Sequence, residues 1–268
     1  MQTFADILRH RFLLENLVAK EFKALYRSMA LGLAWVIVQP LVLITVLSTV
    51  WVVFFHSGRS FASHVLVCLI PYNFFTYAVS GCTGAVQRNV SLVKKVAFPR
   101  QLLPFSVVVT HAIHFGCQAL LIVPVLMLFP PVGQVLGWQL LWLPVIVAVQ
   151  FGLVTGLGFL VSSLNVVYRD VQYIVDSVLT IAFWASPVLY SAQEVLLDRV
   201  EDPYPTWLAG LYYTNPLAGI LEAYRAVLYF GTSPNLLTLG AATVGTLLFG
   251  VLGVWQFWIH EREFADLV

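Results

Sequence analysis

The sequence has 268 residues, of which 60% are hydrophobic and 10% are charged. A soluble domain carries about 25% charged residues, so we expect most of this chain to lie in lipid rather than in water. The formal net charge of +1, and the lack of a basic stripe interleaved with aromatic residues, argue against a nucleic-acid partner.

An amphipathic helix is the first predicted element, over residues 4–29. One face carries Leu14, Val18, Phe22, Leu25 and Met29, and the roughly opposite face carries Asn16, Lys20, Lys23 and Arg27. This division is typical of a helix in the membrane surface, with a cytosolic helix packed on a partner protein as the alternative. The charged residues near the start are unlike a cleaved signal peptide, so we expect uncleaved insertion.

Six apolar spans follow, each long enough to cross a bilayer core of about 30 Å. Their approximate ranges are 31–55, 61–86, 104–129, 138–164, 171–190 and 236–259. We therefore predict an all-α integral membrane protein with six transmembrane helices in one domain. Its parts are an interface helix (1–30), spans one to five (31–190), an external re-entrant segment (191–235), and span six with a cytoplasmic tail (236–268).

The Lys and Arg residues indicate the orientation. Eleven of the 14 lie before span one, between spans two and three, between spans four and five, or after span six, and three lie in the opposite connections. Positive residues gather on the cytoplasmic side of a membrane protein. We therefore expect both termini in the cytoplasm and an even number of spans.

The external segment contains a short predicted helix. Asn215 is suited to cap it, Pro216 to begin it, and Gly231 to follow its last residue. At 1.5 Å per residue, its 15 residues reach about 22 Å, less than the bilayer core. Glu222 and Arg225 lie inside it at a spacing that allows pairing. We predict a re-entrant or interfacial hairpin, and a seventh span is the alternative.

The spans carry few groups suited to catalysis or ion coupling. The four lysines are Lys20, Lys23, Lys94 and Lys95, and none follows a glycine, which excludes a P-loop ATPase. Asp176 is the only acidic residue in the six spans, which argues against proton or sodium coupling. No ATP, Mg or other cofactor is expected on this chain.

Histidine and cysteine are also predicted to be structural. His111 and His114 are three residues apart without a nearby carboxylate, so packing or a hydrogen bond to a neighbouring helix is favoured over metal binding. Cys68, Cys82 and Cys117 lie in or beside apolar runs, where we expect neither a disulfide nor a metal site.

The basic loop between spans two and three, residues 87–100, is the strongest candidate for a functional surface. It offers a short helix in which Leu92, Val93 and Val96 are available to pack, followed by Pro99 as a stop. On the residues alone, a docking element for a soluble partner and a simple positive-inside anchor are both open.

At this loop the sequence resembles the type 2 ABC permeases that export polysaccharide. The resemblance begins with Ser91-Leu92-Val93-Lys94-Lys95-Val96-Ala97-Phe98-Pro99-Arg100 and continues in Leu102-Leu103-Pro104. Further matches are Tyr26-Arg27, Leu31-Gly32, Trp35, Gln39-Pro40, Asn165-Val166-Val167-Tyr168-Arg169-Asp170-Val171, Ser186-Pro187-Val188-Leu189-Tyr190, Asn215-Pro216 and Tyr224-Arg225. They follow the family's order from about residue 20 to 230. Ala24-Leu25 stands where the family has an arginine-rich run.

The resemblance implies a homodimer in the bacterial cytoplasmic (inner) membrane, bound to two ATPase subunits that hold ATP and Mg. The expected cargo is a lipid-linked polysaccharide such as O-antigen, capsule or teichoic acid. The expected coupling residues are Lys20, Lys23, Arg27, Arg88, Leu92, Lys94, Lys95, Phe98, Pro99, Arg100, Arg169 and Asp170.

The resemblance also implies a channel formed largely by spans one and five at the dimer interface. Its candidate lining residues are Trp35, Trp51, Phe54, Phe55, Phe183, Trp184 and Tyr190. Sugar faces stack on aromatic rings, although Trp and Tyr also form interfacial belts and Phe fills helix contacts. A drug or small-lipid exporter of the same type, and a membrane-embedded glycan-processing enzyme, are the alternative functions.

Overall fold

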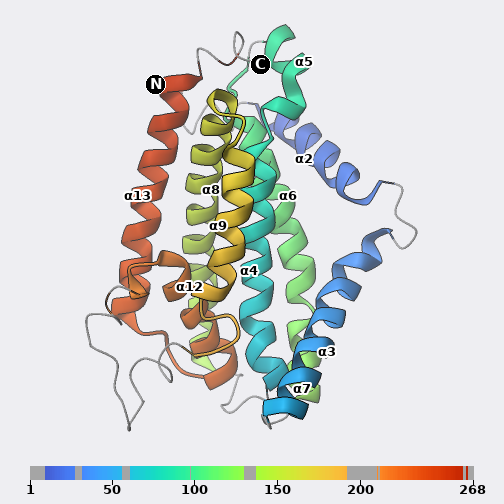
Figure 1. Cartoon of the computed structure of the whole chain (residues 1–268), viewed down its shortest axis with the longest axis vertical. Coiled ribbons are helices and arrows are strands. Elements are labelled where there is room, and N and C mark those ends of the chain that lie inside the picture. The colour runs from blue at the N-terminus through green and yellow to red at the C-terminus, as the bar shows by residue number, and fades with distance from the viewer. Residues whose placement is uncertain are drawn as a thin grey trace.

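The described part of the protein is all-helical (Figure 1). The computed structural model describes residues 10–27, 32–55, 61–96, 98–129, 137–191, 210, 212–261 and 264, without the side chains of Leu33, Val52, Phe54 and Phe55. The elements are α2 (Arg11–Tyr26), η1 (Gly32–Ala34), α3 (Trp35–Phe55), α4 (Phe61–Thr83), η2 (Gln87–Asn89), α5 (Val90–Lys95), α6 (Leu102–Ala119), α7 (Ile122–Leu128), η3 (Trp138–Trp142), α8 (Leu143–Val167), α9 (Val171–Ala185), α12 (Pro216–Arg225), η4 (Ala226–Phe230, a π-helix) and α13 (Leu236–His260).

Every predicted apolar span contains a helix. Among the described residues, four helical stretches are long and apolar enough to cross a membrane: Phe61–Thr83, Leu102–Leu128, Trp138–Val167 and Leu236–His260. Two further apolar helices, Trp35–Trp51 and Val171–Ala185, are shorter. The prediction of an all-α integral membrane protein is confirmed, and the count of six spans stays a prediction.

Helix α4 forms the centre of the bundle. Seventeen of its 23 residues are buried, because α3, α6, α8, α9 and α12 all pack around it. A helix that is apolar on all sides requires apolar surroundings on all sides, and here neighbouring helices supply most of them. Gln150 of α8 donates to the Pro71 carbonyl of α4 (2.7 Å) and accepts from the Tyr224 hydroxyl of α12 (2.8 Å). One buried amide therefore connects three helices.

Helices α8 and α13 approach closely at glycines. A Cβ atom on Gly156 would lie 2.6 Å from the backbone nitrogen of Gly250, and one on Gly253 would collide with the Gly156 carbonyl. Small residues allow membrane helices to pack backbone against backbone. This contact fixes the position of α13, the last long helix, against the rest of the bundle.

The amphipathic helix is present as α2, which packs against α6. The one buried residue of α2 is Leu17, which the prediction did not place on the apolar face. The predicted face residues Leu14, Val18, Phe22 and Leu25 are half-buried. Residues 4–9 and Met29 lie outside the described residues. Placement of α2 in the membrane surface stays a prediction.

The capping signals of the external segment are confirmed. The Asn215 side chain accepts from the Leu217 N–H, Pro216 is the first residue of α12, and Gly231 has a left-handed φ of 65° where the helix ends. Together α12 and η4 cover the 15 predicted residues. The re-entrant placement of this segment stays a prediction.

Candidate functional site

Helix α5 has an apolar underside and a basic outer side. Val93 is buried, whereas Lys94 and Lys95 are exposed. Beneath Val93 lies an apolar cluster drawn from distant parts of the chain: Leu17, Val86, Leu102, Leu103, Phe159, Val166, Phe257 and Phe264. The expectation that Val96 packs was wrong, because the chain leaves the helix there in an extended conformation and Val96 is 52% exposed.

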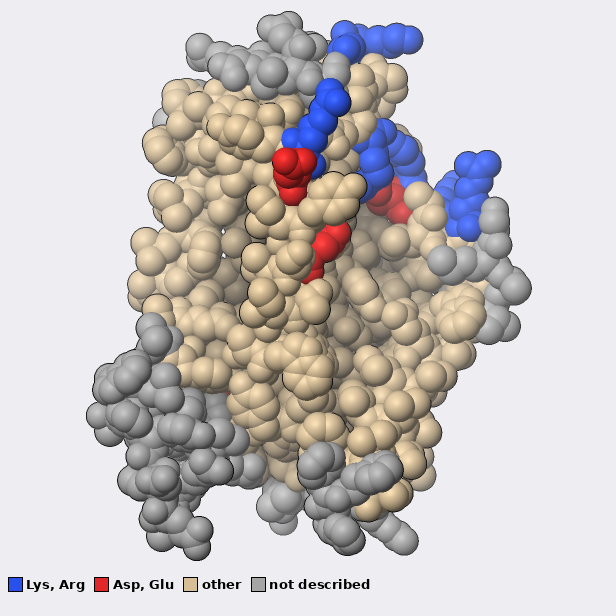
Figure 2. Space-filling view, viewed as in Figure 1, with Lys and Arg blue, Asp and Glu red and all other residues tan. Residues whose placement is uncertain are grey.

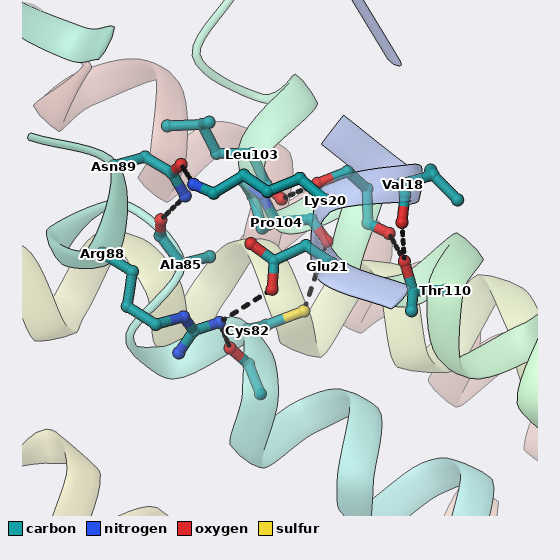
Figure 3. A network of polar contacts seen from close by, with 12 residues as sticks. Val18, Lys20, Glu21, Cys82, Ala85, Arg88, Asn89, Leu103, Pro104 and Thr110 are labelled. Carbon is teal, nitrogen blue, oxygen red and sulfur yellow. Dashed lines mark hydrogen bonds and ion pairs between the residues drawn. The ribbon is translucent and has the colours of Figure 1, made fainter. Parts of the chain in front are cut away.

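A polar network fixes α2 against the start of this loop (Figure 3). Lys20 Nζ donates to Asn89 Oδ1, and Asn89 Nδ2 donates to the Ala85 carbonyl (2.8 Å). Arg88 Nη2 donates to the Gly81 carbonyl (2.7 Å) and lies 3.9 Å from Glu21 Oε2. Arg88 is about half exposed, so this ion pair alone stabilises the fold by at most about 1 kcal/mol.

A second pair of contacts fixes the end of the loop to the end of α13. The Arg100 backbone N–H donates to Glu261 Oε1 (3.1 Å), and its Nη1 donates to the Glu261 carbonyl. Burial raises the pKa of the Glu261 carboxyl, and the N–H and charge of Arg100 partly offset that rise. At the other end, Gln87 Nε2 donates to the Asn165 carbonyl (2.9 Å). The loop is thus held by α2, α8 and α13.

The predicted coupling residues therefore fall into two groups. Lys20, Arg88 and Arg100 hold the loop, and Leu92 and Phe98 are half-buried while Pro99 is buried. The remaining charged members are exposed and form no ion pair or hydrogen bond through their side chains within the described residues: Lys23, Arg27, Lys94, Lys95, Arg169 and Asp170. Figure 2 shows the Lys and Arg residues of one face gathered toward one end of the molecule, the end that carries α5.

The residues Glu21, Asn89 and Glu261 were not predicted as part of this site. Each interacts with a residue far away in the sequence; Glu261, for example, is 161 positions from Arg100. No local sequence pattern predicts a partner so distant in the chain. The only available signal was that polar residues beside apolar runs require hydrogen-bond partners.

The channel aromatics whose side chains the structure describes lie on α3 and on α9 with the residues that follow it. Phe183 and Trp184 of α9 contact edge to face, with centroids 5.4 Å apart, and the Tyr190 hydroxyl lies 3.4 Å from the Trp184 carbonyl. Trp51 of α3 stacks on Phe61 (5.4 Å). Trp35 and Trp184 are 42% and 67% exposed. The side chains of Phe54 and Phe55 lie outside the described residues.

Arg225 connects α12 to the end of α9. Its guanidinium is fully buried, with Nη1 2.7 Å from Glu222 Oε1, which confirms the predicted pairing. Its Nη2 donates to the carbonyls of Pro187 and, at 3.4 Å, Val188. Since Pro187 lies two residues past the end of α9, this one side chain fixes the position of the polypeptide that leaves that helix.

His114 has a structural partner. The Tyr26 hydroxyl of α2 hydrogen-bonds its Nδ1, which confirms the expected bond to a neighbouring helix. The His111 and His114 rings lie 6.5 Å apart. Within the residues that the structure describes, no three His, Cys, Asp or Glu side chains are placed to hold a metal ion.

The comparisons with known proteins agree with one another. The model of the ABC-2 type transporter family matches residues 13–229. The chain is 31% identical to the O-antigen export system permease protein RfbA of Myxococcus xanthus over 267 residues, 98% of both chains. Two such permeases of Klebsiella pneumoniae are each 25% identical, one over 96% of this chain and 95% of the relative, the other over 82% and 81%.

Replacing Arg225 by Leu is expected to destabilise the fold. The change takes the guanidinium away from Glu222 and from two carbonyl groups, and breaking a buried pair in this way costs about 3–5 kcal/mol. The measurement is the monodisperse fraction and thermal unfolding of the protein in detergent. Arg169→Leu, which removes an exposed arginine, is the control. Adding Glu222→Gln to Arg225→Leu is expected to restore part of the stability, and equal stability of Arg225→Leu and Arg169→Leu would contradict the assignment.

Proposed function

The chain belongs to the ABC-2 type transporter family, and we propose that it is the membrane-spanning permease of an exporter of lipid-linked polysaccharide, such as O-antigen. The observation that carries the proposal is the similarity to O-antigen export permeases over nearly the whole length of both chains. ATP hydrolysis falls to a separate ATPase chain, because no lysine here belongs to a Gly-Lys P-loop.

The exposed basic residues support a docking surface for that ATPase. Lys94 and Lys95 lie on a short helix whose underside is packed, within a loop whose two ends are held by hydrogen bonds. A rigid element of this kind transmits motion better than a free loop does. We propose that α5 and the exposed face of α2 contact the ATPase, and that Lys20, Arg88 and Arg100 keep these elements in place.

The exposed apolar surface of α9 supports a second copy of the chain as partner. Tyr173, Ile174, Val178, Ile181 and Trp184 are all more than half exposed in the single chain. Lipid covers such a surface equally well, but the same helix also exposes polar side chains, those of Asp176, Ser177 and Thr180. Polar residues inside a membrane usually face a partner helix or an aqueous path. We propose a homodimer with two ATPase subunits and a cargo path beside α9.

The docking surface is tested by replacing Lys94 and Lys95 with Glu. Their side chains are exposed and form no hydrogen bond or ion pair with a described residue, so the variant is expected to insert and fold normally, yet to lose ATPase co-purification and export. The double Arg replacement keeps the charge and serves as control. Arg100→Gln is expected instead to lower thermal stability, because it loosens the link to Glu261. Normal co-purification and full export by the Glu variant would reduce α5 to a topological anchor.

The proposed topology has six spans and both termini in the cytoplasm. It rests on the gathering of Lys and Arg toward one end of the molecule. A reporter that is active only in the cytoplasm, fused after Val268, is expected to be active. Activity of a reporter that works only after export would instead require an odd number of spans.

The cargo is tested at the exposed ring of Trp184. Because this indole is 67% exposed, Trp184→Ala leaves no cavity and is expected to slow export of long glycans without changing the amount of folded permease. Trp138→Ala, at an equally exposed indole, is the control. Trp51 is partly buried against Phe61, so its removal is expected to reduce the folded amount instead.

The measurement for these variants is the number of glycans exported per folded transporter, with polymer counted on both sides of the membrane. Unchanged export by Trp184→Ala and by its double variant with Trp35→Ala would favour a drug or small-lipid cargo.

A further inference from the structure

A groove runs between α8 and α13 on the outside of the bundle. Its volume is about 720 Å³, within the usual range of ligand sites of about 300–1,000 Å³. Gly152 of α8 forms one wall, Gly250, Val251 and Trp255 of α13 form another, and Gln101 and Trp258 lie among its lining residues. Both helices belong to the stretches that are long and apolar enough to cross a membrane, so the groove opens into the bilayer.

The groove follows from the glycine contact between the two helices. Gly156 and Gly253 bring the backbones together, but a Cβ atom on Gly250 would meet nothing within 4 Å. That side of α13 therefore leaves open space beside the contact. Val251, Val254 and Trp255 along it are apolar and exposed, as expected for a surface that meets hydrocarbon chains.

Gln101 makes this groove more than a gap between helices. The residue precedes α6 and is only 8% exposed, yet its amide forms no hydrogen bond to any described residue. Its amide atoms are not among the fully enclosed polar atoms that lack a partner, so they can be reached from the groove, where a ligand with both acceptor and donor atoms can pair with them. The neighbouring Arg100 is hydrogen-bonded to Glu261, just past the end of α13, which places Gln101 at the polar end of the bundle.

The two tryptophans of the groove indicate the same membrane depth as Gln101 does, near the lipid headgroups. Trp255 and Trp258 lie in the last two turns of α13 and line the groove. Tryptophan is enriched where hydrocarbon meets headgroups. The groove therefore has an apolar body inside the bilayer and a polar end at headgroup depth, which is the division of an amphipathic lipid.

We propose that the groove binds one glycerophospholipid from the leaflet on the side of Arg100. An acyl chain lies along Gly152, Gly250 and Val251, and the Gln101 amide donates to an ester or phosphate oxygen. The bound lipid fills the space beside the α8–α13 contact. The proposal concerns the lipid-facing surface and does not depend on the cargo.

Gly250→Leu tests the proposal because the Cβ atom it adds meets nothing within 4 Å and the side chain occupies space in the groove. The full chain is reconstituted in vesicles of phosphatidylethanolamine and phosphatidylglycerol, extracted in mild detergent, and examined by native mass spectrometry. The unmodified chain is expected to keep one more phospholipid than Gly250→Leu. Gly240→Leu is the matched control, because a Cβ atom at Gly240 on the same helix also meets nothing within 4 Å and this residue is outside the groove.

Gln101→Leu tests the polar end separately. Loss of one hydrogen bond is expected to raise the lipid concentration for half occupancy about fivefold. Thermal unfolding of each variant in lipid-free detergent shows whether the fold is intact. Equal phospholipid retention by the unmodified chain, Gly250→Leu and Gly240→Leu would overturn the proposal. So would recovery from cell membranes of an isoprenoid lipid in the groove in place of a phospholipid.

Discussion

The arrangement of the helices depends on one constraint: a polar group inside the bilayer must find its partner within the protein. Gln150 meets this constraint by bonding both Pro71 and Tyr224, which brings α4, α8 and α12 together. Arg225 meets it by bonding Glu222 and two carbonyls after α9. Apolar packing alone would allow the helices to slide, since lipid tails are as apolar as leucine. The buried hydrogen bonds therefore select one arrangement among many that pack equally well.

The same constraint accounts for the end of the molecule that carries α5. There the chain leaves the apolar bundle, and the hydrogen bonds of long helices no longer pair its backbone N–H and C=O groups. Asn89, Gln87 and Arg100 supply bonds to α2, α8 and α13, while Val93 and Phe257 supply the apolar contacts beneath. A loop of 14 residues, 87–100, is consequently held at both ends and in the middle.

The helices and their caps could be predicted from the sequence because their signals are local. Runs without charge marked the apolar helices, and Asn215, Pro216 and Gly231 marked the limits of the external one. The division among the basic residues could not be predicted. Lys20 and Lys94 have the same chemistry and both follow apolar residues, but Lys20 meets Asn89 only because α2 folds back onto the bundle. Long-range packing also decided that Leu17 is buried and Val96 is not.

The cationic side chains that hold the loop in place are different residues from those exposed on its surface, and this division affects how the surface can evolve. Substitutions at Lys94 or Lys95 change what the surface presents while the bonds of Lys20, Arg88 and Arg100 remain intact. Partner choice can then drift, or be exchanged between related transporters, without passing through unstable intermediates. Mutations that change partner recognition and mutations that change folding stability would then affect different codons, so selection can act on each property separately.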